Sequence, residues 1–391
     1  MKNLWRNFRI RATRQIGQPM NAEDTEKSEK AATRSINIGL QGGGAHGAYS
    51  WGVLDRLLED ERYTFDGISG TSAGAMNAVV LADGLLKGGR EGARQALAEF
   101  WRGIADSVPL HLSVSVPSFT GEEKLALLPT TKMMLNWAQY FSPYQLNPLN
   151  FNPLKKLLKA RIDFMGLRMY SPVRLFLAAT NANTGKLRLF RTQEVSENAV
   201  LASACLPMMH QTIEIDGEPY WDGGYAANPP VFPLFYECQS RDILLVLLAP
   251  PAYGGAPKKV EDIRNRAMEL AFNTSLLREM LLFANIVAYS EARDQEIGEK
   301  KSWPSSLQRV LGRALREPTD LERYTRETRF HLLESDDLLH RFGSATKVAA
   351  DWPFLKKLHD IGYQAASEWL EEHGEQIGKE SSFDLIGRFG V

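Results

Sequence analysis

The sequence predicts a three-layer α/β/α protein with a mostly parallel central sheet, a helical insertion and a helical C-terminal region. Two strand-like runs each pass through a glycine-rich turn into a stretch with helical spacing, over residues 35–58 and 64–82. Short apolar runs at residues 173–180 and 243–248 have the length of buried strands. Strands that alternate with helices are typical of a parallel sheet with helices on both faces.

Periodicity and turn residues predict the remaining elements. In chain order they are a helix after Ser72 that ends near Gly84, a helix at 89–103, strands at 173–180 and 186–190, a helix at 195–205, a hairpin at 211–221, a strand at 243–248, a helix at 261–299, a strand at 329–333 and a helical region at 344–372. The turn Asn183-Thr184-Gly185 joins the strands of the first hairpin. The last helices have broad apolar faces that suit packing against the rest of the chain.

Length and composition bound the class of protein. The chain has 391 residues, of which 44% are hydrophobic and 24% are charged, so it is long enough to bury a sizeable core. Its formal net charge of -1 gives no overall field that would attract nucleic acid. Two cysteines, Cys205 and Cys238, are too few for a disulfide framework and agree with a reducing compartment, so we expect a cytoplasmic protein. The longest apolar run, at 243–251, has the size of a strand and not of a membrane span.

Composition also divides the chain into regions. Residues 1–34 are basic and then polar, as in a disordered tail, and a basic aromatic segment also suits an anionic membrane surface or a mitochondrial presequence. Residues 35–250 carry the glycine-rich turns. Within them, residues 111–170 are rich in proline, methionine and aromatic side chains, which predicts either an apolar lid or a subdomain core. Residues 251–391 should form a mainly helical region packed on the preceding domain.

A glycine-rich turn follows the first predicted strand. Gly42, Gly44 and Gly47 form a G-x-G-x-x-G pattern that leads into a helix. Backbone N–H groups at such a turn bind an anion, either the pyrophosphate of a dinucleotide or the oxyanion of an acyl-transfer reaction. A dinucleotide site also needs an acid at the end of the next strand, whereas this chain has a second glycine-rich turn there. The pattern therefore favours the oxyanion hole.

That second turn is a G-x-S-x-G pattern made of Gly70, Ser72 and Gly74. The flanking glycines allow a sharp turn that forces the serine side chain outward. A glycine-rich connection with no chemical role is the alternative, since five-residue patterns occur by chance. The carboxyl ends of neighbouring parallel strands meet at one edge of a sheet, so the two turns should lie together. The pair predicts a serine nucleophile beside an anion site.

A serine nucleophile needs a base, and the sequence offers two arrangements. Asp222 precedes Gly223 and Gly224, whose backbone freedom lets a carboxylate fit a crowded site. The order Ser72, Asp222, His331 matches that of α/β-hydrolase triads. His331 lies in a plain strand pattern, however, and the other histidines have no context typical of a triad. The base is therefore either Asp222 alone or a histidine oriented by it.

The three motifs, in this order, resemble those of patatin-like phospholipases, and of the bacterial members more than of the plant storage proteins. The resemblance covers about residues 36–250, with a weaker likeness to about residue 369. It implies a Ser–Asp dyad in which Ser72 is the nucleophile and Asp222 the base, within a catalytic domain at 35–250. It also implies a nucleophile elbow shaped by Gly70 and Gly74, and no metal or other cofactor. The implied oxyanion hole consists of backbone N–H groups of Gly42, Gly43, Gly44 and Ala45.

The activity implied by the resemblance is that of a serine lipid acyl hydrolase. Like a phospholipase A or lysophospholipase, it would cleave fatty-acyl esters through an acyl-Ser72 intermediate. An esterase, thioesterase or transacylase on another acyl substrate is the nearest alternative, and an inactive lipid- or protein-binding module or a nucleotide-binding protein is more distant. The expected partners are a lipid or acyl-ester substrate and, peripherally, a membrane surface. Nucleic acid is not expected, and the sequence gives no oligomeric state.

One position departs from the family pattern. Patatin-like proteins commonly carry Arg or Lys where this chain has His46, a side chain usually thought to steady the loop or to meet an anionic head group. Histidine is less charged near neutral pH. The departure weakens the expectation of a preference for anionic phospholipids.

Overall fold

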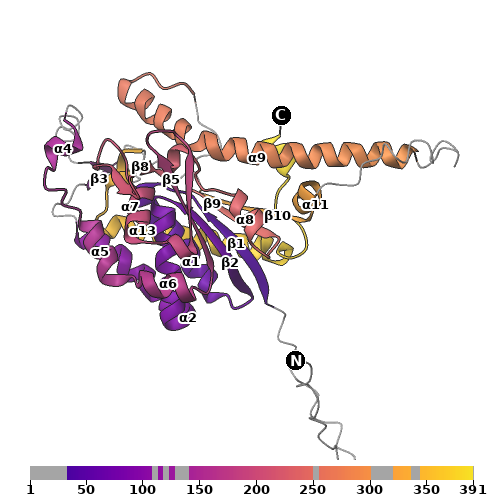
Figure 1. Cartoon of the computed structure of the whole chain (residues 1–391), viewed down its shortest axis with the longest axis horizontal. Coiled ribbons are helices and arrows are strands. Elements are labelled where there is room, and N and C mark those ends of the chain that lie inside the picture. The colour runs from indigo at the N-terminus through magenta and orange to yellow at the C-terminus, as the bar shows by residue number, and fades with distance from the viewer. Residues whose placement is uncertain are drawn as a thin grey trace, which may run out of the picture. The chain divides into compact units, whose positions relative to one another are not determined.

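A central sheet positions every motif found in the sequence (Figure 1). Among the described residues its strands are β1 (Arg34–Leu40), β2 (Tyr63–Thr71), β5 (Arg174–Asn181), β6 (Leu187–Arg191), β7 (Ile213–Ile215), β8 (Glu218–Asp222), β9 (Asp242–Leu247) and β10 (Arg329–Glu334). They lie in the order β10-β9-β1-β2-β5-β8-β7, with β6 also paired to β5. The strands from β10 to β5 are parallel, and β6, β7 and β8 pair in antiparallel fashion. The predicted mostly parallel sheet is confirmed.

The computed structural model describes residues 33–107, 113–117, 123–127, 141–249, 255–300, 320–335 and 344–390. From Thr33 onward the chain forms one compact unit. The predicted N-terminal tail lies outside the described residues as far as residue 32, whereas Arg34 already begins β1.

Helices cover both faces of the sheet. One face carries α1 (Gly47–Glu59), α2 (Ala73–Asp106), α7 (Glu197–Ser203) and α13 (Trp352–His373), and the other carries α8 (Phe232–Glu237), α9 (Val260–Lys300) and α14 (Leu385–Phe389). Alternate side chains of β9 serve the two layers, with Leu244 and Val246 in the first core and Ile243 and Leu245 in the second. The three-layer α/β/α architecture is therefore confirmed. Shorter pieces are α11 (Asp320–Glu327) and the single turns η1 (Gly44–His46), η2 (Thr192–Glu194), η3 (Gly223–Tyr225), η4 (Ser344–Val348) and η5 (Gly374–Gln376).

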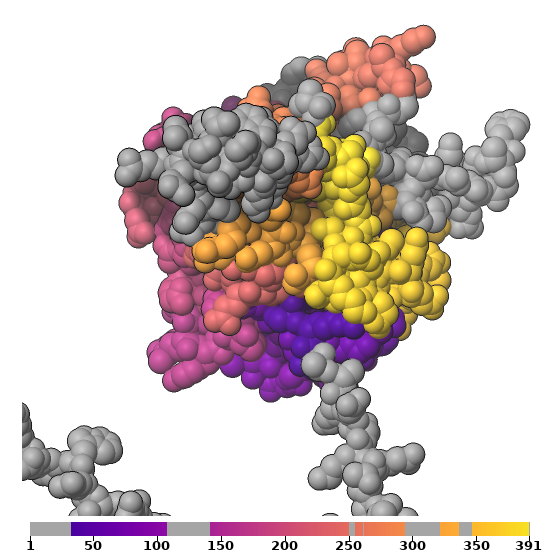
Figure 2. All heavy atoms as spheres, turned by 90° about the vertical axis from the view of Figure 1, so that its right-hand side faces the viewer, coloured from indigo at the N-terminus to yellow at the C-terminus, as the bar shows by residue number. Residues whose placement is uncertain are grey.

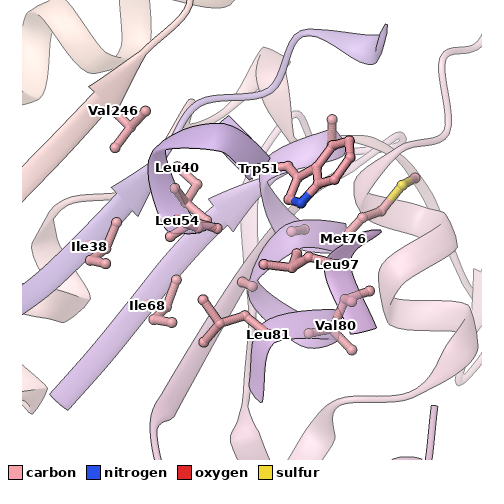
Figure 3. Packing of buried hydrophobic residues seen from close by; sticks show 14 of the residues in the cluster. Ile38, Leu40, Trp51, Leu54, Ile68, Met76, Val80, Leu81, Leu97 and Val246 are labelled. Carbon is pink, nitrogen blue, oxygen red and sulfur yellow. The ribbon is translucent and has the colours of Figure 1, made fainter. Parts of the chain in front are cut away.

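The larger core holds α1 and α2 against the sheet. Figure 3 shows side chains of the strands and of these helices packed together, among them Ile38, Leu40, Ile68, Val246, Trp51, Leu54 and Leu81. Each fully buried side chain of this size contributes about 1.5–3 kcal/mol to folding. This packing fixes the starts of α1 and α2, and with them the two glycine-rich turns that precede the helices.

Helix α2 extends further than the sequence predicts. The expected end near Gly84 is wrong, because the first non-helical backbone comes at Gly88 and Gly89. Gly84 stays helical and lets the two halves of α2 pack closely, since a Cβ atom there would lie 2.5 Å from the Cα atom of Ala93. The glycine serves a helix contact and not a helix end.

The insertion at 111–170 contains both helices and a hairpin in its described part. These elements are β3 (Ser113–Pro117), β4 (Glu123–Leu127), α4 (Pro143–Leu146), α5 (Pro153–Arg161) and α6 (Phe164–Tyr170). The predicted helical insertion is confirmed, and the irregular sequence gave no signal for the hairpin. Residues 108–112, 118–122 and 128–140 lie outside the described residues, so the lid stays a prediction.

The helical C-terminal region is confirmed, and it contributes to the sheet as well. Strand β10 is an edge strand beside β9, and α13 packs along α1. Figure 2 shows the C-terminal residues, in yellow, against the indigo residues where the described chain begins. There the Arg34 guanidinium donates to the Gly374 carbonyl over 3.0 Å.

Helix α9 is apolar over much of its length. Within the described residues, its segment Asp262–Arg293 is long and apolar enough to cross a membrane, judged by length and composition alone. No continuous apolar run marks this segment, so the sequence alone predicts no membrane span there. One side of α9 packs Leu276, Met280 and Phe283 into the second core, while Leu277 is 51% exposed. Core packing therefore accounts for part of its apolar character.

Candidate active site

The G-x-S-x-G turn holds Ser72 in a strained backbone conformation between β2 and α2. Its φ of 56° is unfavourable for a residue with a side chain. Gly70 and Gly74 allow the turn because the backbone is crowded there: a Cβ atom on Gly74 would lie 2.2 Å from the Leu40 carbonyl oxygen. The Ser72 N–H donates to Ser203 Oγ over 2.9 Å. The turn therefore presents the Ser72 side chain beyond the carboxyl end of β2.

Sheet register brings Asp222 to the same place. Thr71 pairs with Ala178 of β5, and Asp222 pairs with the next residue, Ala179. The Asp222 N–H donates to the Cys205 carbonyl over 2.8 Å, and its carbonyl accepts from Thr180 Oγ1 over 2.8 Å. These contacts fix the end of β8 beside the Ser72 turn.

The Asp222 carboxyl group is buried, with 2% of the residue exposed. Burial raises its pKa to about 7, while hydrogen bonding from the Gly224 N–H, over 2.7 Å, and from the Ser72 side chain lowers it. The group is thus far more basic than an ordinary aspartate, whose pKa is about 3.9. A carboxyl group with a pKa near neutrality and a serine hydroxyl beside it is suited to proton transfer.

The backbone N–H groups of the first glycine-rich turn differ in whether they already have a hydrogen-bond acceptor. The Gly42 N–H donates to Asn228 Oδ1 over 2.7 Å, so this donor is already used. Gly43 and Gly44 line the cavity, and within the described part of the chain their N–H groups have no hydrogen-bond partner. Ala45 is buried and is not among the lining residues. Of the four predicted oxyanion residues, Gly43 and Gly44 therefore combine a place in the cavity lining with N–H groups that have no partner among the described residues.

A cavity of about 340 Å³ joins these groups. Ser72, Asp222, Gly43 and Gly44 are among its lining residues. Its apolar lining includes Leu206, Met208, Met209, Leu248, Met268 and Phe272. A mainly apolar cavity with a few convergent polar groups is typical of a site for an apolar ligand.

Buried amides brace the loop around the cavity. Gln41 Oε1 accepts from the N–H groups of Leu248 and Ala249 over 2.6 and 2.8 Å, and its Nε2 donates to Asn273 Oδ1 over 2.8 Å. Asn228 holds Gly42 as described above. The sequence motifs predict no role for Gln41, Asn228 or Ser203. Only the nearness of Gln41 and Asn228 to known motifs could have singled them out.

The two histidines singled out in the sequence lie elsewhere. His331 is buried in β10, with Nε2 3.0 Å from Asp242 Oδ1 at the start of β9. His46 is buried as well, with Nε2 2.8 Å from Thr346 Oγ1, so it links the glycine-rich loop to η4. Neither lines the cavity, and no other histidine does among the described residues. The cation that reaches the cavity is Lys347, which pairs with Glu269 over 3.1 Å.

A strained serine turn, a buried acid and a glycine-rich loop at one apolar cavity are the kinds of group that acyl transfer requires. Residues 39–235, just over half of the chain, match the family described as Patatin-like phospholipase. The chain belongs to the patatin-like phospholipase family and is a lipid acyl hydrolase. A search of curated proteins finds no match.

Two solved structures are similar in part. VipD from Legionella pneumophila is 16% identical, with a TM-score of 0.36 over 88% of this chain and 68% of that one. The heterodimeric ExoU–SpcU complex from the type III secretion system of Pseudomonas aeruginosa contains a chain that is 15% identical, with a TM-score of 0.26 over 88% of this chain and 76% of that one.

Proposed function

We propose that Ser72 and Asp222 are the catalytic dyad of this lipid acyl hydrolase, and that it cleaves fatty-acyl esters as a phospholipase A or lysophospholipase does. The main support is that the strained Ser72, the buried Asp222 with a pKa of about 7, Gly43 and Gly44 all line one mainly apolar cavity. Acyl transfer needs a nucleophile, a base and an anion site within one pocket.

In the first step Ser72 Oγ attacks the ester carbonyl carbon while Asp222 takes the hydroxyl proton. The carbonyl oxygen becomes an oxyanion that accepts hydrogen bonds from Gly43 and Gly44, and one such donor is typically worth about 3 kcal/mol of transition-state stabilisation. The tetrahedral intermediate collapses, the alcohol leaves with the proton from Asp222, and the acyl group remains on Ser72.

In the second step water attacks the acyl-Ser72 carbonyl carbon, and Asp222 takes a proton from that water. Collapse of this second intermediate releases the fatty acid, and the proton returns to Ser72 Oγ. Asp222 must be ionised at the start of both steps, and its raised pKa makes it a better base once it is. No histidine takes part in this scheme.

Hydrolysis of a p-nitrophenyl acyl ester and of a phospholipid tests the proposal. We expect Ser72→Ala and Asp222→Asn each to lower kcat by about a thousandfold or more, because each removes a group that acts in the transition state. Matched controls on α13, Ser367→Ala and Asp360→Asn, should keep wild-type rates. Full activity in Ser72→Ala would exclude the mechanism, and product in which the acyl group moves to an alcohol instead of water would identify a transacylase.

A further inference from the structure

Large apolar side chains are exposed on two segments near the cavity. We call them the apolar rim: Leu146, Leu149, Phe151, Met208 and Met209. Leu149 is 91% exposed and Phe151 60%, and the other three are between 48% and 63% exposed. Exposed apolar side chains scattered singly need no explanation, but a group of this size marks an interaction surface.

Hydrogen bonds tie the two segments of the apolar rim together. Gln211 Nε2 donates to the Asn147 carbonyl over 2.7 Å, and the Thr212 N–H donates to the Tyr144 hydroxyl over 3.3 Å. Residues 144–151 and 208–212 are therefore neighbours in space. The apolar rim is one surface and not two isolated loops.

The tip of the apolar rim is held in shape. Asn147 Nδ2 donates to the Phe151 carbonyl over 2.9 Å, and the Phe151 N–H donates to Asn147 Oδ1 over 2.9 Å. These two bonds close a tight turn that projects Leu149. A turn that already has its bound shape loses little entropy when it docks.

The apolar rim continues into the cavity. Met208 and Met209 belong to the rim and also line the cavity that holds Ser72 and Asp222. A ligand that covers the rim would therefore meet the mouth of the cavity. In a lipid acyl hydrolase, the compound that must enter there is a lipid.

One cation of α5 lies beside the apolar rim without an acidic partner in the described part of the chain. Residues 141–154 carry no charged side chain, and α5 has Lys155, Lys156, Lys159 and Arg161 and no acid. Lys155 and Lys159 pair with Glu197 over 3.4 and 3.6 Å, and Arg161 pairs with Glu99, whereas Lys156 forms no ion pair with a described residue. Lys156 Nζ lies 5.0 Å from the centre of the Phe151 ring, so this cation lies directly beside a side chain of the apolar rim. Apolar side chains flanked by lysines are typical of a segment that binds an anionic membrane surface.

We propose that the apolar rim inserts into an anionic lipid surface, with α5 against the head groups, so that the cavity opens towards the lipid. This inference rests on the proposed function of the cavity, which gives a reason for the cavity to open towards lipid. Its test measures vesicle binding and needs no turnover. A second copy of the chain on the same surface is the competing occupant. A bilayer accounts for Lys156 beside Phe151 and for the methionines that the rim shares with the cavity lining.

Binding to vesicles tests the proposal with the full chain carrying Ser72→Ala, so that no lipid is consumed. The probes are vesicles of phosphatidylcholine alone and of phosphatidylcholine mixed with phosphatidylglycerol. We expect Leu149→Ser with Phe151→Ser to weaken binding to the mixed vesicles at least about tenfold, because two inserted apolar side chains are lost. The matched control is Leu187→Ser on β6 with Tyr236→Ser on α8, two exposed side chains outside the apolar rim and outside the segment Asp262–Arg293, and it should bind within about twofold of the parent.

A second pair of measurements separates this inference from the proposed function. In the chain with Ser72 restored, the rim variant should lose hydrolysis of vesicle phospholipid and keep hydrolysis of a soluble short-chain ester. If no variant or parent hydrolyses any ester, the proposed function fails while the binding result still decides the role of the rim. Equal vesicle binding by parent and rim variant would overturn the inference, and so would binding lost only in the Leu187→Ser, Tyr236→Ser control. A parent dimer that the rim substitutions convert to monomers without weaker vesicle binding would assign the surface to a second copy.

The basic helix gives a finer test. Lys156→Gln should weaken binding to the mixed vesicles about fivefold and leave binding to phosphatidylcholine alone unchanged, because each lysine near an anionic surface adds a modest attraction. The control is Lys379→Gln. Lys379 belongs neither to α5 nor to the apolar rim, and it pairs with Glu375. Equal losses on both vesicle types would contradict a role in head-group recognition.

Discussion

Two parts of the cavity lining, here called walls, come from different regions of the chain. The reactive wall consists of Gly43, Gly44 and Ser72, which follow β1 and β2, and of Asp222, the last residue of β8. The C-terminal wall comes from α9 and η4, and its members are Asn265, Met268, Glu269, Phe272, Asn273, Lys347 and Val348. The reactive wall holds the groups suited to acyl transfer, whereas the C-terminal wall supplies apolar surface and one ion pair.

The two walls are specified in different ways. The reactive wall depends on backbone conformation, so it needs particular residues at particular positions: Gly74 where a Cβ atom would strike the Leu40 carbonyl oxygen, and a sharp turn at Ser72. The C-terminal wall needs only side chains of suitable size on one face of α9. The comparison predicts that reactive-wall substitutions remove turnover, whereas C-terminal-wall substitutions change which substrates are turned over.

The largest difference between the two walls should be the pH dependence of activity and stability that Asp222 causes. Because Asp222 must be ionised, wild-type kcat/KM should rise about tenfold per pH unit below pH 7 and level off above it. The pKa is raised in the folded state, so the protonated group favours folding at low pH, and this contribution is lost as pH rises through about 7. Asp222→Asn should therefore be inactive yet more stable than wild type in alkaline solution.

Urea unfolding of both proteins measures that stability. Between about pH 5 and about pH 8, the stability advantage of Asp222→Asn should grow by on the order of 2 kcal/mol, since the wild type then carries a buried charge. Asp360→Asn, at an exposed position on α13, should show no such growth. A stability difference that does not change with pH would mean that Asp222 titrates like an ordinary aspartate.

A smaller effect is expected from the C-terminal wall. Met268→Ala removes apolar surface from the cavity and leaves the reactive groups in place, so kcat/KM for a long-chain ester should fall about tenfold and that for a short-chain ester should stay within about twofold. Leu270→Ala, two residues further along α9 and outside the cavity lining, is the matched control. Equal losses on both esters would show that this wall also supports the chemistry.

The same contrast explains how much the sequence could predict. The strands of the central sheet, their mostly parallel arrangement and the positions of Ser72 and Asp222 follow from short patterns, because local backbone constraints leave a signature in a few neighbouring residues. The contact of Asn228 with Gly42 and the approach of α9 to the cavity depend on residues far apart in the chain. The helix end expected at Gly84 failed for the same reason, since a tertiary contact and not the local backbone requires that glycine.

The smallest effect on activity should come from a substitution of His331. This substitution distinguishes a Ser–Asp dyad from a Ser–Asp–His triad. His331 contacts Asp242 at the start of β9, away from the cavity, so His331→Ala should keep kcat within about twofold of wild type. The substitution should still lower stability by about 2–3 kcal/mol, because it leaves a cavity in a buried site and removes a hydrogen bond from Asp242. Thermal unfolding and ester hydrolysis, measured well below the melting temperature, distinguish the two roles. A large loss of kcat with unchanged stability would make His331 the base and would reduce Asp222 to the residue that orients it.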